Sequence, residues 1–135
     1  MLIEIFVGLL LGIVLVLLVR KYKQEGWLYS AVLVSLPLIY VTYALVIGDF
    51  STAVKELLVG GPFLIGGFWC LMFRVPMSAR ITGILWLMHA LFDVAHGLLF
   101  VNHGVPEWYP LFCGAVDTVI GSYLVLSKIF ARRLI

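Results

Sequence analysis

Apolar residues follow one another in long runs along most of this chain, and polar residues gather in the short breaks between the runs. A helix needs about 20 apolar residues to cross the hydrocarbon of a bilayer. Five runs reach that length, and we expect each to form a membrane-spanning helix. They cover residues 2–19, 27–47, 53–73, 81–101 and 110–130. The predicted fold class is therefore all-α, a polytopic membrane helix bundle in which residues 1–135 form a single transmembrane domain.

The third run has the weakest pattern. Lys55 and Glu56 lie near its start, and Pro62 lies within it. If this segment were only a surface helix, the chain would have four transmembrane helices and both of its ends would lie on the same side of the membrane.

The composition agrees with a membrane protein, because 64% of the residues are hydrophobic and 12% are charged. A soluble domain has about 45–50% apolar and roughly 25% charged residues. We therefore expect a lipid bilayer as the surroundings of the chain and no nucleic acid as a partner. Since the loops are short, any chemistry must lie inside the bundle or at its mouth.

The positions of the basic residues decide between four and five spans. With five spans, Lys55 alone lies on one side, and the other eight of the 9 basic residues share the opposite side. These eight are Arg20, Lys21, Lys23, Arg74, Arg80, Lys128, Arg132 and Arg133. The positive-inside rule assigns that side to the cytoplasm. The prediction is a multi-pass protein of the cell inner membrane with five spans, its N-terminus outside and its C-terminus inside.

Ionisable residues form a stripe on each of the last two spans. His89, Asp93 and His96 are spaced by four and three residues and share one face of the fourth helix. Cys113 and Asp117 have the same helical spacing on the fifth. The connection between the two spans is short, so the helices are antiparallel neighbours and their stripes can face each other. Asp93 and Asp117 then lie at similar depth, in the outer half of the membrane.

The two buried carboxylates need a neutralising partner. An ionised aspartate at mid-membrane costs about 2.5–3.5 kcal/mol, and every Lys and Arg lies at or near a membrane surface. The negative charge could be neutralised in four ways: by protonation, by hydrogen bonds from histidine, by a charged partner subunit or by a bound cation. A divalent ion, bound by two carboxylates and neutral imidazoles, leaves no net charge. His89, Asp93, His96 and Asp117 are therefore candidate ligands for zinc, iron or manganese.

Helix geometry restricts which residues can share one ion. His89 and His96 are separated by roughly 10.5 Å along the helix axis. Sets of three residues can bind one ion more easily. The two possible sets are Asp93, His96 and Asp117, or His89, Asp93 and Asp117. The histidine left over could support a ligand or carry a proton. Glu56, Tyr40 and Tyr43 fall in the same outer half, on other helices.

Two further features have simple explanations. Cys113 could be a soft ligand, but a small buried filler is the preferred interpretation. Cys70 lies near the opposite membrane face, so no disulfide is expected between the two cysteines. Aromatic residues at the predicted interfaces fit an aromatic belt. They are Trp27, Tyr29, Trp108 and Tyr109.

The residues of the last third also carry a resemblance. The order G-x-x-W-L-x-H-x-x-[WF]-D-x-x-H, then prolines, then C-x-x-x-D, resembles a family of small, uncharacterised bacterial integral membrane proteins. Its positions here are Gly83, Trp86, Leu87, His89, Phe92, Asp93, His96, Pro106, Pro110, Cys113 and Asp117. Phe92 stands where the pattern has Trp, and Gly97 stands where it has a second His. The resemblance supports this choice of site residues and implies no reaction.

The sequence supports several functions. The leading hypothesis is a metal-dependent enzyme acting on a lipophilic molecule, with Asp93 and Asp117 as its catalytic carboxylates. Hydrolysis would use metal-bound water with Asp93 or Asp117 as the base, and oxidation would use the ion as a redox centre. The alternatives are a proton- or cation-coupled carrier and a small subunit of a larger complex. A homo- or hetero-oligomer is compatible with each of them.

Overall fold

The computed structural model describes residues 1–75 and 77–131, and five long helices account for most of them. These are α1 (Leu2–Lys21), α2 (Leu28–Val46), α3 (Phe50–Met72), α4 (Ser78–Leu99) and α5 (Tyr109–Ala131). All five are long and apolar enough to cross a membrane, which confirms the predicted fold class. α3 has 23 residues and is about 35 Å long, so the third run needs no separate explanation as a surface helix.

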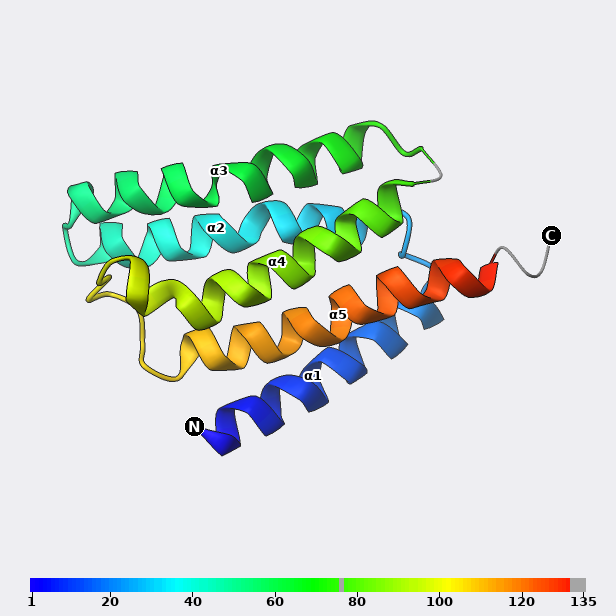
Figure 1. The fold of residues 1–135 in the computed structure, drawn as a ribbon, viewed down its shortest axis with the longest axis horizontal. Helices are drawn as coiled ribbons and strands as arrows, with labels where there is room; N and C mark the ends of the chain where they lie inside the picture. The colour runs from blue at the N-terminus through cyan, green and yellow to red at the C-terminus, as the bar shows by residue number, and fades with distance from the viewer. Residues whose placement is uncertain (76, 132–135) are drawn as a thin grey trace.

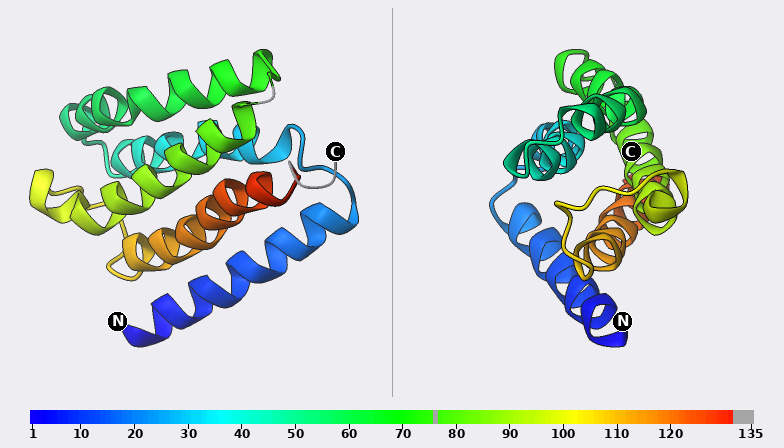
Figure 2. Two further views of the ribbon diagram at one scale, coloured as in Figure 1. Left: turned by 45° about the vertical axis from the view of Figure 1, so that its right-hand side comes forward. Right: turned by 90° about the vertical axis from the view of Figure 1, so that its left-hand side faces the viewer.

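Consecutive helices run in opposite directions and form a single bundle (Figure 1). α4 packs along α5, and α2 packs along α3. α1 packs on α5 at the edge of the bundle, as both views in Figure 2 show. The first residues of α1 and the last turn of α5 lie at opposite ends of the bundle (Figure 1), as an odd number of spans requires.

The charges divide between the two ends of the bundle. We call the end where α1 finishes and α2 and α4 begin the basic end. The described basic side chains there are Arg20, Lys21, Lys23, Arg74 and Arg80. Lys55 lies near the start of α3, at the far end. Arg132, Arg133 and the side chain of Lys128, which were assigned to the same side, lie outside the described residues.

Side chains at the far end fix the start of α3. Asp49 caps the helix, and its carboxylate accepts hydrogen bonds from the Thr52 backbone N–H at 3.0 Å and from the Thr52 hydroxyl at 2.6 Å. The two hydrogen bonds lower the pKa of Asp49 from its ordinary value. The cap fixes where α3 begins, and thus the depth at which Glu56 enters the bundle.

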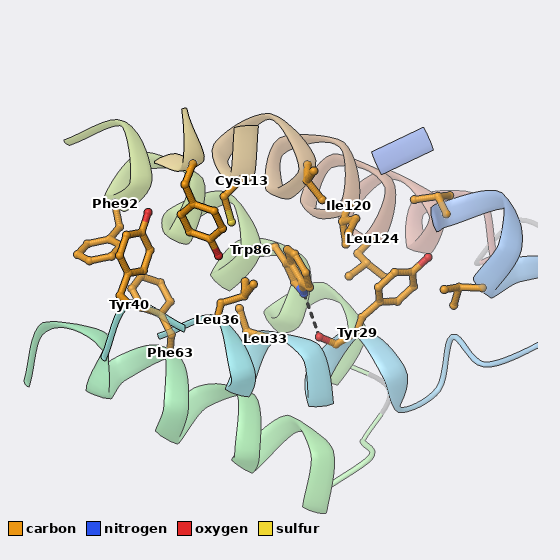
Figure 3. Close-up of a cluster of buried hydrophobic side chains, with 14 residues drawn as sticks. Tyr29, Leu33, Leu36, Tyr40, Phe63, Trp86, Phe92, Cys113, Ile120 and Leu124 are labelled. Atoms are coloured by element: carbon orange, nitrogen blue, oxygen red, sulfur yellow. Dashed lines mark hydrogen bonds between the residues drawn. The ribbon is translucent and has the colours of Figure 1, made fainter. Parts of the chain in front are cut away.

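Buried aromatic side chains tie α2 to α4. The Trp86 indole N–H donates to the Tyr29 carbonyl oxygen at 3.1 Å (Figure 3). Tyr29 and Tyr109 are 3% and 8% exposed, so both belong to the core and not to an exposed aromatic belt. Trp27 and Trp108 are 41% and 49% exposed, as that belt would require. Cys70 and Cys113 are both free.

A glycine lets α2 and α3 approach closely, and this yields a prediction. A Cβ atom added at Gly60 would lie 2.5 Å from the Pro37 Cβ, whereas one added at Gly61 meets nothing within 4 Å. We expect Gly60→Ala to lower the stability by about 1–3 kcal/mol through overpacking. Gly61→Ala should leave it unchanged or raise it slightly, because alanine favours helix. Thermal unfolding of both variants in detergent, followed by circular dichroism, checks this, and equal midpoints would contradict the packing.

Candidate metal centre

Two helices that cross at a close approach supply the candidate ligands. α4 carries His89 and Asp93, and α5 carries Cys113 and Asp117. The helices come close because small residues lie at the contact: a Cβ atom added at Gly121 would lie 2.9 Å from the carbonyl oxygen of α4 at position 83. The short side chains of the four residues can therefore meet between the helices.

The four side chains converge on one buried point. The distance from His89 Nδ1 is 2.7 Å to Asp117 Oδ2 and 3.5 Å to Asp93 Oδ2. Cys113 Sγ lies 3.9 Å from Asp117 Oδ1. One ligand atom from each of the four residues lies within 4.8 Å of every other. We call these four residues the His–Asp–Cys group.

The group is closed to water. His89 and Asp117 are 0% exposed, Asp93 is 1% exposed and Cys113 is 6% exposed. Figure 3 shows Cys113 pointing from α5 into the buried cluster, in the part of the bundle between Tyr40 and Trp86. Charged groups at such a place depend on one another for stabilisation, because the solvent cannot supply it.

The group has an unbalanced negative charge and polar atoms without hydrogen bonds. Asp93 Oδ1 accepts a hydrogen bond from the Tyr40 hydroxyl at 2.7 Å, but Asp93 Oδ2 and His89 Nε2 have no hydrogen-bond partner among the described residues. Two carboxylates against one imidazolium leave one negative charge. Every Lys and Arg whose side chain the structure describes is exposed, so none of them supplies the missing positive charge. A cation or an additional proton would complete the balance.

His96 lies in a different contact. Its Nε2 is 2.7 Å from Glu56 Oε1 on α3, and the same oxygen accepts a hydrogen bond from the Asn102 side-chain amide at 2.7 Å. Asn102 also donates to the Tyr40 carbonyl oxygen at 3.1 Å. The Tyr40 ring stacks on the His96 ring with centroids 4.4 Å apart. We call His96 and Glu56 the His–Glu pair; an imidazolium and a carboxylate in it would neutralise each other.

The structure thus brings together three of the four predicted ligands. His89, Asp93 and Asp117 meet, which is one of the two smaller sets expected, and His96 takes a separate partner. Cys113, for which the preferred interpretation was a buried filler, also lies within the group. Sequence reasoning missed Asn102 entirely, because an asparagine two residues before a glycine, in a short loop, is typical of a turn.

An apolar groove reaches the group from the lipid-facing side. α1 packs on α5 while α2 packs on α3, and between α1 and α2 lies a cavity of about 310 Å³. Aliphatic and aromatic side chains from both helices form its walls, among them Leu15 and Leu36. Cys113 and Asp117 also line it. A hydrophobic molecule in this groove would therefore lie next to the His–Asp–Cys group.

No protein-family model, curated protein or solved structure matches the chain. The chemistry of the site is therefore argued from the positions, burial and charges of its own residues.

Proposed function

We propose that the protein is a multi-pass inner-membrane protein in which the His–Asp–Cys group binds one divalent transition metal. The bound metal would then support a reaction on a lipophilic molecule, which the groove between α1 and α2 would hold. The observation that carries this proposal is the convergence of four ligand atoms within 4.8 Å of one another, at a place with no described lysine or arginine.

Charge balance supports a divalent ion. With His89 neutral, the two carboxylates and one M²⁺ sum to zero. Cys113 bound as a thiolate brings the sum to one negative charge, which is still less than the two that the carboxylates carry without the metal. The mixed nitrogen, oxygen and sulfur donors suit zinc or iron, and manganese is the less favoured candidate because a thiolate is a soft ligand. Asp93 Oδ2, which is buried and forms no hydrogen bond with the described residues, would become a ligand.

The observed separations are close to those of a metal site. Bonds of about 2.0–2.3 Å in a tetrahedron separate the ligand atoms by roughly 3.3–3.8 Å. The widest separation in the group is 4.8 Å at most, so binding requires movements of about 1 Å. Rotation of the Cys113 and Asp93 side chains is sufficient for such movements.

The residues around the ion would have distinct roles. A bound metal would supply Lewis-acid activation of a water molecule or a redox centre. Tyr40, which donates to Asp93 Oδ1, would hold that carboxylate in place. Asp93 or Asp117 would accept the proton released from the water in a hydrolysis. The groove has a volume of about 310 Å³, which lies within the range of small-molecule sites, and its apolar walls favour a hydrocarbon chain.

Elemental analysis tests the proposal. Protein purified in detergent, loaded with zinc, iron or manganese and dialysed, should keep about one metal ion per chain. Asp93→Asn combined with Asp117→Asn should keep none, because the amides preserve the shape of the side chains and remove both charges. Asp49→Asn, which alters a carboxylate outside the group, is the matched control and should bind like the wild type.

Two results would contradict the proposal. The first is wild-type protein that keeps none of the three ions after dialysis. The second is equal metal content in the wild type and the double variant. Weak, exchangeable binding together with ion uptake into liposomes would favour the cation carrier instead.

A further inference from the structure

A second cavity lies at the basic end of the bundle and shares no residue with the His–Asp–Cys group. Its volume is about 480 Å³, and its lining comes from α2 to α5, from the connection before α2 and from the connection between α3 and α4. Most of its polar groups are hydroxyls or charged side chains, unlike the apolar groove. It therefore has the chemistry of a site for a polar molecule.

Two opposite charges line this cavity. Glu25 and Arg74 both line it, and both are exposed. The salt bridges formed among the described residues include neither of them. The Glu25 carboxylate accepts a hydrogen bond from the Tyr123 hydroxyl, which fixes its position at the cavity. A ligand with one positive and one negative group could contact both residues.

Tyr29, which lines the cavity, has a buried hydroxyl without a hydrogen-bond partner among the described residues. Tyr29 is 3% exposed and its hydroxyl forms no hydrogen bond with the described residues. Figure 3 shows its ring extending from α2 past Leu124 toward α5, and the ring centroid lies 6.4 Å from that of Tyr123. A buried hydroxyl without a partner is unfavourable, and a polar group bound in the cavity would give it one. Two tyrosine rings next to Glu25 also suit an ammonium ion.

The opposite wall suits an anion. α4 begins at Ser78, and no side chain accepts a hydrogen bond from its first turn. The Ser78 hydroxyl donates instead to the Phe73 carbonyl oxygen at 2.6 Å. The Ser78 N–H donates to the Val75 carbonyl oxygen at 2.8 Å, so the helix dipole is what makes this end attractive to phosphate, and the Arg74 guanidinium adds a full positive charge beside it.

We propose that this cavity binds a phosphoethanolamine group, with its ammonium at Glu25 and the two tyrosine rings and its phosphate at Arg74 and the start of α4. The cavity opens at the end of the bundle, where the head groups of a bilayer lie, so an aminophospholipid is one source of this chemistry. Free phosphoethanolamine is the other source. The proposal does not depend on metal binding at the His–Asp–Cys group.

Native mass spectrometry of the full chain in detergent tests the proposal with three dioleoyl lipids. Phosphatidylethanolamine should bind at least about tenfold more tightly than phosphatidylglycerol, which has no ammonium. Phosphatidylethanolamine should also bind more tightly than phosphatidylcholine, because the methylated ammonium of phosphatidylcholine cannot donate hydrogen bonds to Glu25. Calorimetry with free phosphoethanolamine separates the two sources: a heat of binding identifies the soluble molecule, and its absence together with lipid binding identifies the lipid.

Matched variants connect the binding to the cavity. Glu25→Gln and Arg74→Gln should each weaken phosphatidylethanolamine binding by about tenfold, and Tyr29→Phe should weaken it severalfold. Arg80→Gln and Glu107→Gln remove exposed charges that do not line the cavity and should have no effect. The Asp93→Asn/Asp117→Asn variant should bind the lipid normally. Equal binding of all three lipids, or an equal loss in Arg74→Gln and Arg80→Gln, would overturn the proposal.

Discussion

Replacing His89 with leucine should lower the free energy of unfolding of the metal-free protein by about 3–5 kcal/mol. His89 is 0% exposed, and its Nδ1 lies 2.7 Å from Asp117 and 3.5 Å from Asp93. The substitution leaves both carboxylates buried with no positive group near them. Unfolding in detergent by a denaturant series, with a chelator present to remove metal, measures the change.

Two further variants identify charge as the cause. His103→Leu makes the same substitution at an exposed loop position and should change stability by less than about 0.5 kcal/mol. His89→Leu combined with Asp117→Leu removes both the imidazole and one carboxylate, and should recover most of the lost stability. If the double variant is no more stable than His89→Leu, lost packing and not an uncompensated charge explains the effect.

The fold could be predicted from the sequence because bilayer thickness sets the length of each helix. The uncertainty about the third run has a physical origin in Glu56. Together with Lys55 and Pro62, this residue gave the run its weak hydrophobic pattern, yet it is 1% exposed and hydrogen-bonded to His96. The charge that argued against a span is therefore a buried partner of another helix. Sequence reasoning could not pair them, because nothing local fixes the rotation of α3 relative to α4.

The site could be predicted in part for a related reason. The short connection between α4 and α5 makes them antiparallel neighbours, and this allowed the stripes containing Asp93 and Asp117 to be placed face to face. His89 and His96 lie on the same stripe, so helical spacing cannot decide which of them turns toward α5. Glu56 makes that choice by binding His96, and the Asn102 amide donates to the same Glu56 oxygen. Glu56 lies on another helix and is distant from His96 in sequence.

Cys113 is a second residue whose place in the site could not be predicted from the sequence. A cysteine in an apolar helix is usually a packing residue, and its type gave no reason to prefer a ligand. The rotation of α5 decides the matter, because it places Cys113 Sγ 3.9 Å from Asp117 Oδ1 and within the His–Asp–Cys group. Whether the thiol binds metal is then a question for measurement.

Replacing Cys113 with alanine should weaken zinc binding by about a hundredfold or more, if the proposed metal site is correct. Loss of a group that only supports a ligand costs 10–100-fold in metal affinity, at about 1.4 kcal/mol for each factor of ten, and loss of a ligand should cost at least as much. Competition with a chromophoric chelator in detergent measures the dissociation constant. With Co²⁺ in place of zinc, the wild type should show a thiolate-to-cobalt absorption band, which Cys113→Ala should lack.

Cys70→Ala is the matched control because Cys70 is also free and buried, at 2% exposed, but lines the cavity at the basic end. It should bind zinc like the wild type and keep the cobalt band. Cys113→Ser separates the thiol from the space that it fills, since the hydroxyl has a similar shape but is a poor ligand for zinc. It should therefore bind zinc as weakly as the alanine variant. Equal affinities in Cys113→Ala and Cys70→Ala would show that Cys113 is a packing residue, leaving His89, Asp93 and Asp117 as the protein ligands.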